Sequence, residues 1–273
     1  MSVVPVKVWG AINVTPDSFS DGGRFAEPGA ALDHARRLIA DGADSLDIGG
    51  ESTRPGAEAV AEADEIARVV PLIRAIRAES AVALSIDTMK PAVARAALAA
   101  GATIWNDVTA LRHAPDSLTV AAELGCEVVL MHMQGQPGTM QVEPHYDNVV
   151  AEVADFLNQR AAAAIAAGVA RGRIWLDPGI GFGKQMIRHN LPLLAGLDRI
   201  VALGFPVLLG VSRKRFIAAL DDGGRDPDQR LGGSIAAALA GAAAGVAAVR
   251  VHDVRETVQA LRVWAAISQP HQA

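Results

Sequence analysis

The sequence predicts an α/β fold, a single (β/α)8 barrel, and three observations lead to that prediction. Short apolar runs with β-branched residues alternate with Ala-rich amphipathic stretches, and each kind occurs eight times. Eight strands, each followed by a helix, are the number that closes a parallel barrel. The length of 273 residues suits one such domain, and no Pro/Ser-rich linker or run of charge divides it. We therefore expect one TIM-barrel domain over residues 1–273.

Each predicted element can be placed along the chain. The expected strands are Lys7 to Val14, Ser45 to Ile48, Val82 to Asp87, Thr103 to Val108, Glu127 to His132, Ile174 to Asp177, Pro206 to Val211 and Val246 to Val251. The expected helices are Pro28 to Asp41, Glu62 to Glu79, Pro91 to Ala100, Ser117 to Leu124, Asn148 to Ala167, Asn190 to Leu203, Gln229 to Ala244 and Arg255 to Ile267. Several of them end at a Gly, which commonly follows a helix C-terminus. An open doubly wound sheet alternates in the same way and is the competing architecture.

Composition restricts the class of partner. A net charge of −5 and a pI near 5.8 argue against nucleic acid and favour a small ligand. The longest run without a polar side chain, Ile235 to Val249, is shorter than the roughly 20 residues that cross a bilayer. Met1 to Val8 lacks the apolar region of a signal peptide. The single Cys126 excludes an intramolecular disulfide. We expect a cytoplasmic protein without a membrane partner.

The segment Asp177 to Lys184 (DPGIGFGK) is the most unusual in the chain, because Gly recurs at every second position after a predicted strand. Gly permits positive φ and close approach to a ligand, and binding groups collect in loops at strand ends. The segment is not a dinucleotide fingerprint, because position 184 is Lys, nor a P-loop, because Gln185 follows that Lys. The alternative is a tight turn with a solvated Asp. We expect Lys184 to be a solvated or loop-supporting charge.

Polar residues end nearly every predicted strand. In a parallel barrel these ends share one mouth, where functional groups collect. Packing alone does not explain them, because burying an unpaired charge costs several kcal/mol. These residues are Asn13, Asp47 with Glu51, Asp87, Asn106 with Asp107, His132, Asp177, Ser212 with Lys214, and Arg250 with His252.

The residues at this mouth divide into two groups by their chemistry. Carboxylate and amide groups that could bind the N–H edge of a flat heterocycle are Asp87, Asn106 and Asp177. Residues on the first, second and last strands suit an anion such as phosphate; they are Asn13, Thr53, Arg54, Arg250 and His252. Lys214 could serve either group. The sequence has no His/Cys metal cluster, but Asn13 or Asp21 together with a phosphate could hold Mg²⁺.

With these residues in place, the whole chain resembles the bacterial dihydropteroate synthases. The motifs occur in order, one to a strand: NVTPDSFSDGG from Asn13, DIGGESTRPG from Asp47, SIDT from Ser85, NDV from Asn106, LMHMQG from Leu130, DPGIGFGK from Asp177, SRK from Ser212 and RVH from Arg250. The resemblance implies a transferase of folate biosynthesis. It would join 6-hydroxymethyl-7,8-dihydropterin diphosphate to p-aminobenzoate, giving 7,8-dihydropteroate and diphosphate by an SN1-like mechanism.

The resemblance also implies the role of individual residues. The pterin pocket would comprise Asp87, Asn106, Asp177 and Lys214, with Val108, Met131, Phe182 and Gly210 as walls and Ser212 among the substrate-binding residues. The diphosphate and its Mg²⁺ would lie against Asn13, Thr53, Arg54, Arg250 and His252. Two flaps carrying Phe19, Asp21 and Pro55 would form the p-aminobenzoate pocket, where sulfonamides would compete. The residues implied in catalysis are Asp21, Lys214, Arg250 and His252.

Two positions differ from the usual pattern of the resemblance, and two other functions remain open. Arg215 stands where many relatives have a small hydroxyl residue, and the candidates to hold the benzoate carboxylate are a helix N-terminus and the charge of Arg215; Ile180 replaces a frequent Phe, a change in packing. The alternatives are a methyltransferase that transfers a methyl group from methyltetrahydrofolate to a corrinoid protein, and a pterin-binding paralogue without catalysis. The Ala-rich late helices, Ile235 to Val249 and Val258 to Ile267, would suit the seam of a homodimer.

Overall fold

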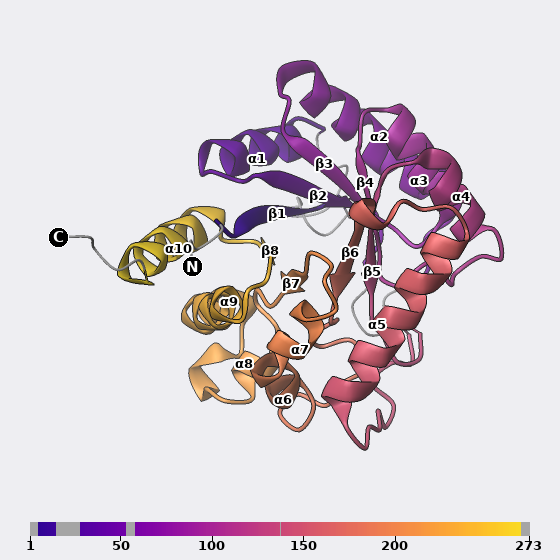
Figure 1. Ribbon diagram of the computed structural model, residues 1–273. Helices are drawn as coiled ribbons and strands as arrows, with labels where there is room; N and C mark the ends of the chain where they lie inside the picture. Colours follow the sequence, from indigo (N-terminus) through magenta and orange to yellow (C-terminus); the bar gives the residue numbers. More distant parts are fainter. Residues whose placement is uncertain (1–4, 15–27, 53–57, 137, 269–273) are drawn as a thin grey trace.

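The computed structural model describes residues 5–14, 28–52, 58–136 and 138–268, and its strands form a closed parallel barrel (Figure 1). The strand order is β6-β5-β4-β3-β2-β1-β8-β7, with every pairing parallel. A bridge between Leu176 and Val207 joins the first strand of that order to the last. The predicted (β/α)8 barrel is therefore confirmed. The strands are β1 (Lys7–Asn13), β2 (Ser45–Gly49), β3 (Ala83–Asp87), β4 (Ile104–Asp107), β5 (Glu127–Met131), β6 (Ile174–Asp177), β7 (Leu208–Gly210) and β8 (Ala248–Val251).

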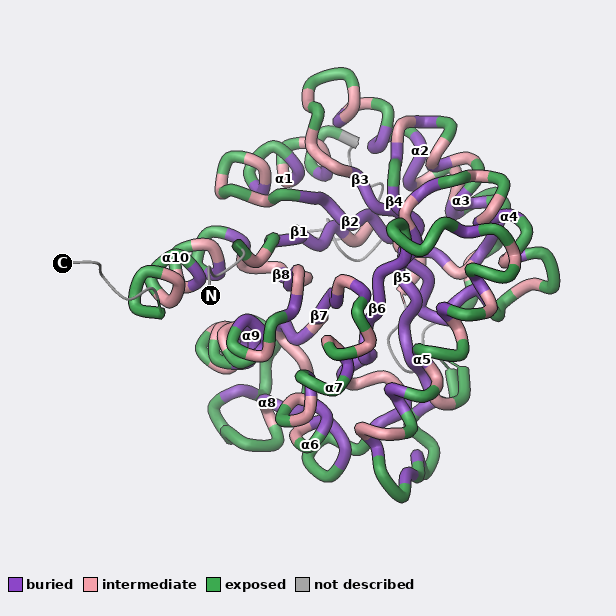
Figure 2. The backbone as a smooth tube through the Cα atoms, in the orientation of Figure 1, coloured by how far each residue is buried: buried purple, intermediate pink, exposed green. Residues whose placement is uncertain are grey.

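Helices surround the barrel, and their outer faces are exposed while the strands are almost entirely buried (Figure 2). The helices are α1 (Pro28–Ala40), α2 (Glu62–Glu79), α3 (Pro91–Ala99), α4 (Ser117–Leu124), α5 (Val149–Ala166), α6 (Asn190–Ala195), α7 (Leu197–Val201), α8 (Arg215–Ala218), α9 (Leu231–Ala244) and α10 (Val254–Ser268). Short 3₁₀ turns are η1 (Arg171–Arg173), η2 (Asp222–Gly224) and η3 (Pro227–Arg230). None of the helices in the described ranges is long and apolar enough to cross a bilayer.

Two features of the helical layer differ from the sequence prediction. The single helix expected over Asn190 to Leu203 is two helices, α6 and α7, which meet at Gly196. A Cβ at Gly196 would lie 2.8 Å from Val150 on α5, so close packing against α5 explains the Gly there. The segment between β7 and α9 also holds α8 and two 3₁₀ turns. The buried Arg230 organises it by donating hydrogen bonds to the carbonyls of Arg213, Gly224 and Arg225.

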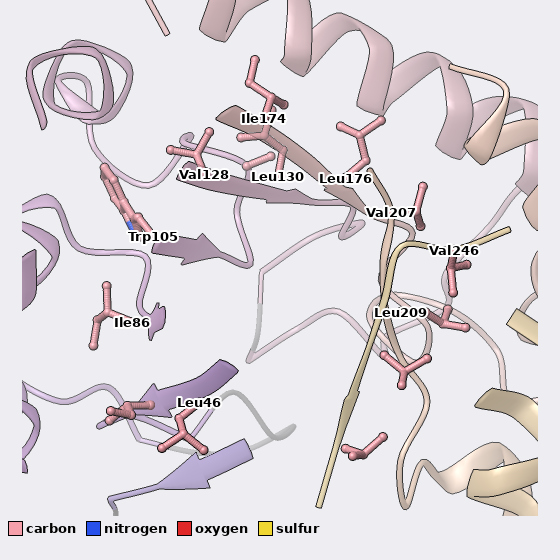
Figure 3. Close-up of a cluster of buried hydrophobic side chains, with 14 of the residues drawn as sticks. Leu46, Ile86, Trp105, Val128, Leu130, Ile174, Leu176, Val207, Leu209 and Val246 are labelled. Atoms are coloured by element: carbon pink, nitrogen blue, oxygen red, sulfur yellow. The ribbon is translucent and has the colours of Figure 1, made fainter. Parts of the chain in front are cut away.

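The strands have two buried faces, as expected for a barrel covered by helices. Side chains on the outer face pack beneath the helices, among them Leu46, Trp105 and Leu130 (Figure 3). A second cluster fills the lower part of the barrel interior and contains Trp9, Ile104, Val129, Trp175, Leu208 and Ala248. Two rings of this cluster, Trp9 and Trp175, lie 5.4 Å apart between centroids. Going along each strand, the next inward-facing positions are mostly polar, so the interior changes from apolar to charged towards the mouth.

We predict that Trp9→Ala destabilises the barrel much more than Trp264→Ala does. Trp9 is 2% exposed inside the barrel, whereas Trp264 is only partly buried on α10. Truncating a fully buried aromatic side chain costs about 3–5 kcal/mol, because apolar contacts are lost and a cavity is left. Urea unfolding followed by circular dichroism measures both free energies of unfolding. Equal losses would show that the interior layer does not support the barrel in this way.

Candidate functional site

Four polar side chains meet inside the barrel above the apolar layer. Arg250 on β8 donates from Nε to Asp47 Oδ2 and from Nη2 to Asp87 Oδ2, the latter at 3.0 Å. Asn106 on β4 donates from Nδ2 to the same Asp47 oxygen at 3.1 Å. Although burial opposes it, the charge of these two carboxylates raises the pKa of Arg250 above its ordinary value. The guanidinium thus holds together groups from four strands, and Asp87 and Asn106 lie side by side in register.

This cluster leaves several buried acceptors without a protein donor. Within the described ranges, no residue hydrogen-bonds to Asp47 Oδ1, Asp87 Oδ1, Asn106 Oδ1 or Ser85 Oγ, all of which are buried. Burial, followed by the nearby Asp47 carboxylate, raises the pKa of Asp87 to about 7 despite the opposing charge of Arg250. Unpaired buried acceptors are costly unless a partner satisfies them. The arrangement suits a ligand that presents several N–H groups.

Asp177, at the end of β6, adds a third carboxylate from the opposite side of the barrel. It is 6% exposed, and its Oδ1 accepts a hydrogen bond from the Gly179 amide at 2.7 Å. Burial raises its pKa, while the Gly179 bond and the charge of Lys214 act in the opposite direction. The neighbouring strand carries Gly210, where a Cβ would lie 3.9 Å from Asp177 Oδ2. The Gly therefore leaves space beside that oxygen for a ligand.

An apolar wall stands next to these acceptors. Val108, Met131, Met133 and Met140 form one buried cluster, and the ring of Phe182 packs against it. The Nζ of Lys214, which precedes α8, lies 4.3 Å from the centroid of the Phe182 ring. Burial lowers the pKa of Lys214 to about 8, although Asp177 opposes that shift. The structure thus brings together the predicted wall residues Val108, Met131 and Phe182 with the predicted Lys214.

Ser212 and His252 form a second polar group beside Arg250. The backbone N–H of His252 donates to Ser212 Oγ at 3.2 Å, and the same oxygen lies 3.0 Å from His252 Nδ1. Burial, together with the charge of Arg250, lowers the pKa of His252 to about 3. The ring is therefore neutral at neutral pH. The contact between Ser212 Oγ and Nδ1 fits either ring tautomer; in the tautomer with Nδ1 as the acceptor, the Nε2–H is left to donate a hydrogen bond to an anion.

The predicted anion and metal residues are only partly described. Asn13 ends β1 and is half-buried, whereas Phe19, Asp21, Thr53, Arg54 and Pro55 lie outside the described residues. In the described part of the chain, no group of three or more His, Cys, Asp or Glu is placed to hold a metal ion. Asn13 offers an amide oxygen, a type of donor that hard cations bind.

Three strand-end residues are held by partners outside the cluster around Arg250. Asp107 accepts hydrogen bonds from the Thr109 amide and hydroxyl and from the Leu111 amide, in a turn where Leu111 has a φ of 59°. Its role is to shape that turn. His132 contacts Lys184 beneath the 177–184 loop. Glu51 pairs with Lys90, outside the cluster around Arg250.

Sequence reasoning missed the role of Lys90. This side chain is 6% exposed, and its Nζ donates to Glu51, to Glu65 Oε2 at 2.7 Å and to Val60 O at 2.6 Å. It thereby links Glu51 and Val60, which lie before and after residues 53–57 in the sequence, to the start of α3. The signal was a Lys between the end of a strand and the Pro that starts a helix, but no local pattern identifies its partners.

Comparison with known proteins shows the family of this chain. Residues 9–252 match the family described as pterin binding enzyme. The chain is 48% identical over 248 residues to a dihydropteroate synthase of Streptococcus pyogenes, covering 91% of this chain and 90% of that protein. The solved dihydropteroate synthase of Xanthomonas albilineans with 4-aminobenzoic acid has a TM-score of 0.90 and 53% identity, covering 97% and 94% of the two chains. A structure of the same enzyme in complex with 7,8-dihydropteroate has a TM-score of 0.88 and 49% identity, covering 99% and 97%.

Proposed function

Because this chain belongs to the dihydropteroate synthase family, we propose that the mouth of its barrel joins 6-hydroxymethyl-7,8-dihydropterin diphosphate to p-aminobenzoate. The products are 7,8-dihydropteroate and diphosphate. One observation carries this proposal: buried acceptors without protein donors lie beside an apolar wall. A pterin is a flat ring whose amino-pyrimidine edge presents N–H groups, and such a ring satisfies both features.

The pterin ring is bound by groups on four strands and on the segments that follow strands β4, β6 and β7. Asp87, Asn106 and Asp177 accept its N–H groups, since a carboxylate can accept two parallel N–H bonds. Its faces lie between the wall of Val108 and Met131 and the ring of Phe182, while Lys214 donates to its carbonyl side. Charged hydrogen bonds of this kind contribute about 1.5–3 kcal/mol each to affinity.

The diphosphate is bound at the other side of the mouth, near β1 and β8. His252 Nε2 donates to it, and Asn13 offers the protein ligand for Mg²⁺. Mg²⁺ held there would supply positive charge to neutralise the diphosphate leaving group. Thr53 and Arg54, together with the flap residues Phe19, Asp21 and Pro55, complete this side; their part of the proposal comes from the sequence motifs alone.

The chemistry separates bond breaking from bond making. The bond between the pterin methylene carbon and the diphosphate oxygen breaks first, and the electron pair leaves with the oxygen. The positive charge that remains on the pterin is stabilised by the carboxylates of Asp87 and Asp177, which are held in place before the reaction. The lone pair of the aniline nitrogen of p-aminobenzoate then forms the C–N bond, and that nitrogen gives one of its two protons to water or to the departed diphosphate. No covalent bond to the protein is needed.

We predict that the protein releases diphosphate when given the pterin diphosphate, p-aminobenzoate and Mg²⁺, and that a sulfonamide suppresses the release.

Asp177→Asn should weaken pterin diphosphate binding about 10- to 150-fold, the equivalent of one charged hydrogen bond, because an amide would turn a donor towards the ligand. Calorimetry measures the affinity, and Asp198→Asn on the exposed side of α7 is the matched control. Absence of diphosphate release would refute the proposed reaction. Equal affinity of Asp177→Asn and the parent would refute the role of Asp177.

We predict an alkaline limb in the pH profile of kcat/KM for the pterin diphosphate. Lys214 has a lowered pKa of about 8 in the folded protein, so it is charged below that pH and neutral above it. Because kcat/KM reports groups of the free enzyme, it should fall as pH rises through about 8. Lys214→Arg should keep kcat/KM constant to higher pH, since Arg stays protonated, whatever the absolute rate. Lys7→Arg at the opposite end of the barrel is the control, and an identical limb in Lys214→Arg would assign it to another group.

We also propose that the protein is a homodimer that works in the cytoplasm. The Ala-rich α9 and the exposed Val263 and Ile267 of α10 support a seam on this side, since these two side chains are 55% and 78% exposed. Burial in the fold raises the pKa of the single thiol, Cys126, to about 11, which is consistent with an unreactive residue in a reducing compartment. Light scattering should give twice the chain mass of 28.3 kDa. A monomer at micromolar concentration would contradict the dimer.

A further inference from the structure

A buried lysine lies beneath the loop that carries two of the pterin-facing residues. Lys184 is 1% exposed, and its Nζ donates to Gly179 O at 2.9 Å and to Phe182 O at 3.0 Å. The same atom lies 2.9 Å from His132 Nδ1 and 3.4 Å from His132 O, at the end of β5. The expected loop-supporting role fits these contacts, whereas the expectation of a solvated charge was wrong.

A neutral His132 ring can accept a hydrogen bond from Lys184. Burial, together with the charge of Lys184, lowers the pKa of His132 to about 2, so its ring is neutral. With Nδ1 as an acceptor, an ammonium group at Lys184 directs its three hydrogens to Gly179 O, Phe182 O and His132 Nδ1. All three contacts are 3.0 Å or shorter. Within the described ranges no carboxylate forms an ion pair with Lys184, so its partners are neutral groups.

The loop lies directly on the segment that follows β5. Gly179 has a φ of +67°, and a Cβ there would come within 1.9 Å of His132 O. Gly183 has a φ of +58°, and a Cβ there would come within 2.4 Å of Gln134 O. Only Gly fits such an approach of two backbones at positive φ. The glycines have no side chains to hold the two backbones together. Lys184 supplies hydrogen bonds at this contact.

The two loop carbonyls that Lys184 binds, Gly179 O and Phe182 O, belong to residues next to the pocket. The Gly179 amide holds Asp177 Oδ1, and the Phe182 ring forms part of the apolar wall and contacts Lys214. The amide of Phe182 also donates to Gly179 O at 3.0 Å, so both anchored carbonyls belong to one turn. Movement of this turn would displace the acceptor and the wall together.

We propose that Lys184 is a positioning residue for pterin recognition, which fixes Asp177 and Phe182 from behind without touching the substrate. The inference rests on the proposed function only for the identity of the ligand. Neither a catalytic nor a phosphate-binding role fits, because the side chain is 1% exposed and its Nζ is already bound by protein acceptors. Three further bonds hold the same loop at its edges: Asn190 to the Gly181 amide, Gln141 to Gly181 O and Tyr146 to Gly183 O.

The test replaces Lys184 by Met, which keeps the apolar stem and removes the three donors. We expect the Kd for pterin diphosphate to rise tenfold or more, while kcat at saturating pterin diphosphate and the KM for p-aminobenzoate stay within about twofold. Arg188→Met is the matched control, because it removes an exposed cation from the same segment, and its Kd should equal that of the parent. Thermal unfolding establishes that each variant is folded. An unchanged Kd in folded Lys184→Met overturns the proposal, as does a loss of kcat with the Kd unchanged.

A second measurement does not depend on the ligand. Hydrogen exchange of the Phe182 amide in the ligand-free protein should be at least tenfold faster in Lys184→Met than in the parent, because its acceptor Gly179 O is no longer held. Unchanged exchange overturns the proposal, even if the protein were to bind another ligand. Failure of the parent to bind pterin diphosphate, with exchange accelerated as expected, overturns the proposed function alone. If Lys184→Met does not fold, the same two measurements apply to Lys184→Gln, where parental values for both would overturn the proposal.

Discussion

The contact of Arg250 with Asp47 and Asp87 is the interaction on which the rest of the site depends. An unpaired carboxylate inside a barrel costs several kcal/mol, and two adjacent ones repel each other as well. One guanidinium satisfies one oxygen of each Asp and leaves the other oxygens buried without protein donors. Without this cation, the two side chains would bind protons or turn towards solvent. The acceptors that a ligand can use therefore exist because Arg250 holds the opposite oxygens, and the apolar layer around Trp9 ensures that the ligand enters from the mouth alone.

Buried cations also organise the loops around this cluster, and each uses different partners. Lys90 is paired with Glu51 and Glu65, so its charge is compensated directly. Lys184 contacts only carbonyl groups and a neutral imidazole, and burial lowers its pKa to about 7. The charge of Asp177 acts against that shift. Lys90 is stabilised by the opposite charges of its carboxylate partners. Lys184 is stabilised only by hydrogen bonds to neutral acceptors, so it depends on the positions in which the glycine turn holds them.

The fold and much of the site could be predicted because they follow from short-range regularities. Counting apolar runs gave eight strands, and the polar residues at their ends fell at one mouth, including Asp87, Asn106 and Asp177. Long-range geometry limited the rest. Asp47 and Arg250 are separated by 203 positions, and no local pattern shows that they meet. Alternation along a strand explains why Asn106 faces the pocket and its neighbour Asp107 does not, but only the structure shows which of the two lies inside. The break at Gly196 and the burial of Lys184 likewise depend on contacts with α5 and β5 that the sequence does not display.

The selectivity of the pocket for a ligand follows from which of its polar atoms are bonded within the protein and which have no protein donor. Asp87 and Asn106 are in register on adjacent strands, and each already uses one polar atom within the cluster. Neither remaining oxygen can rotate towards a protein donor without giving up a contact to Arg250 or Asp47. The buried acceptors of the pocket therefore need N–H donors from a ligand. A ligand of the same shape without those groups would leave the acceptors unpaired, and sites of this kind reject such analogues by several orders of magnitude. Under the proposed function, strand register therefore decides which ring the pocket recognises.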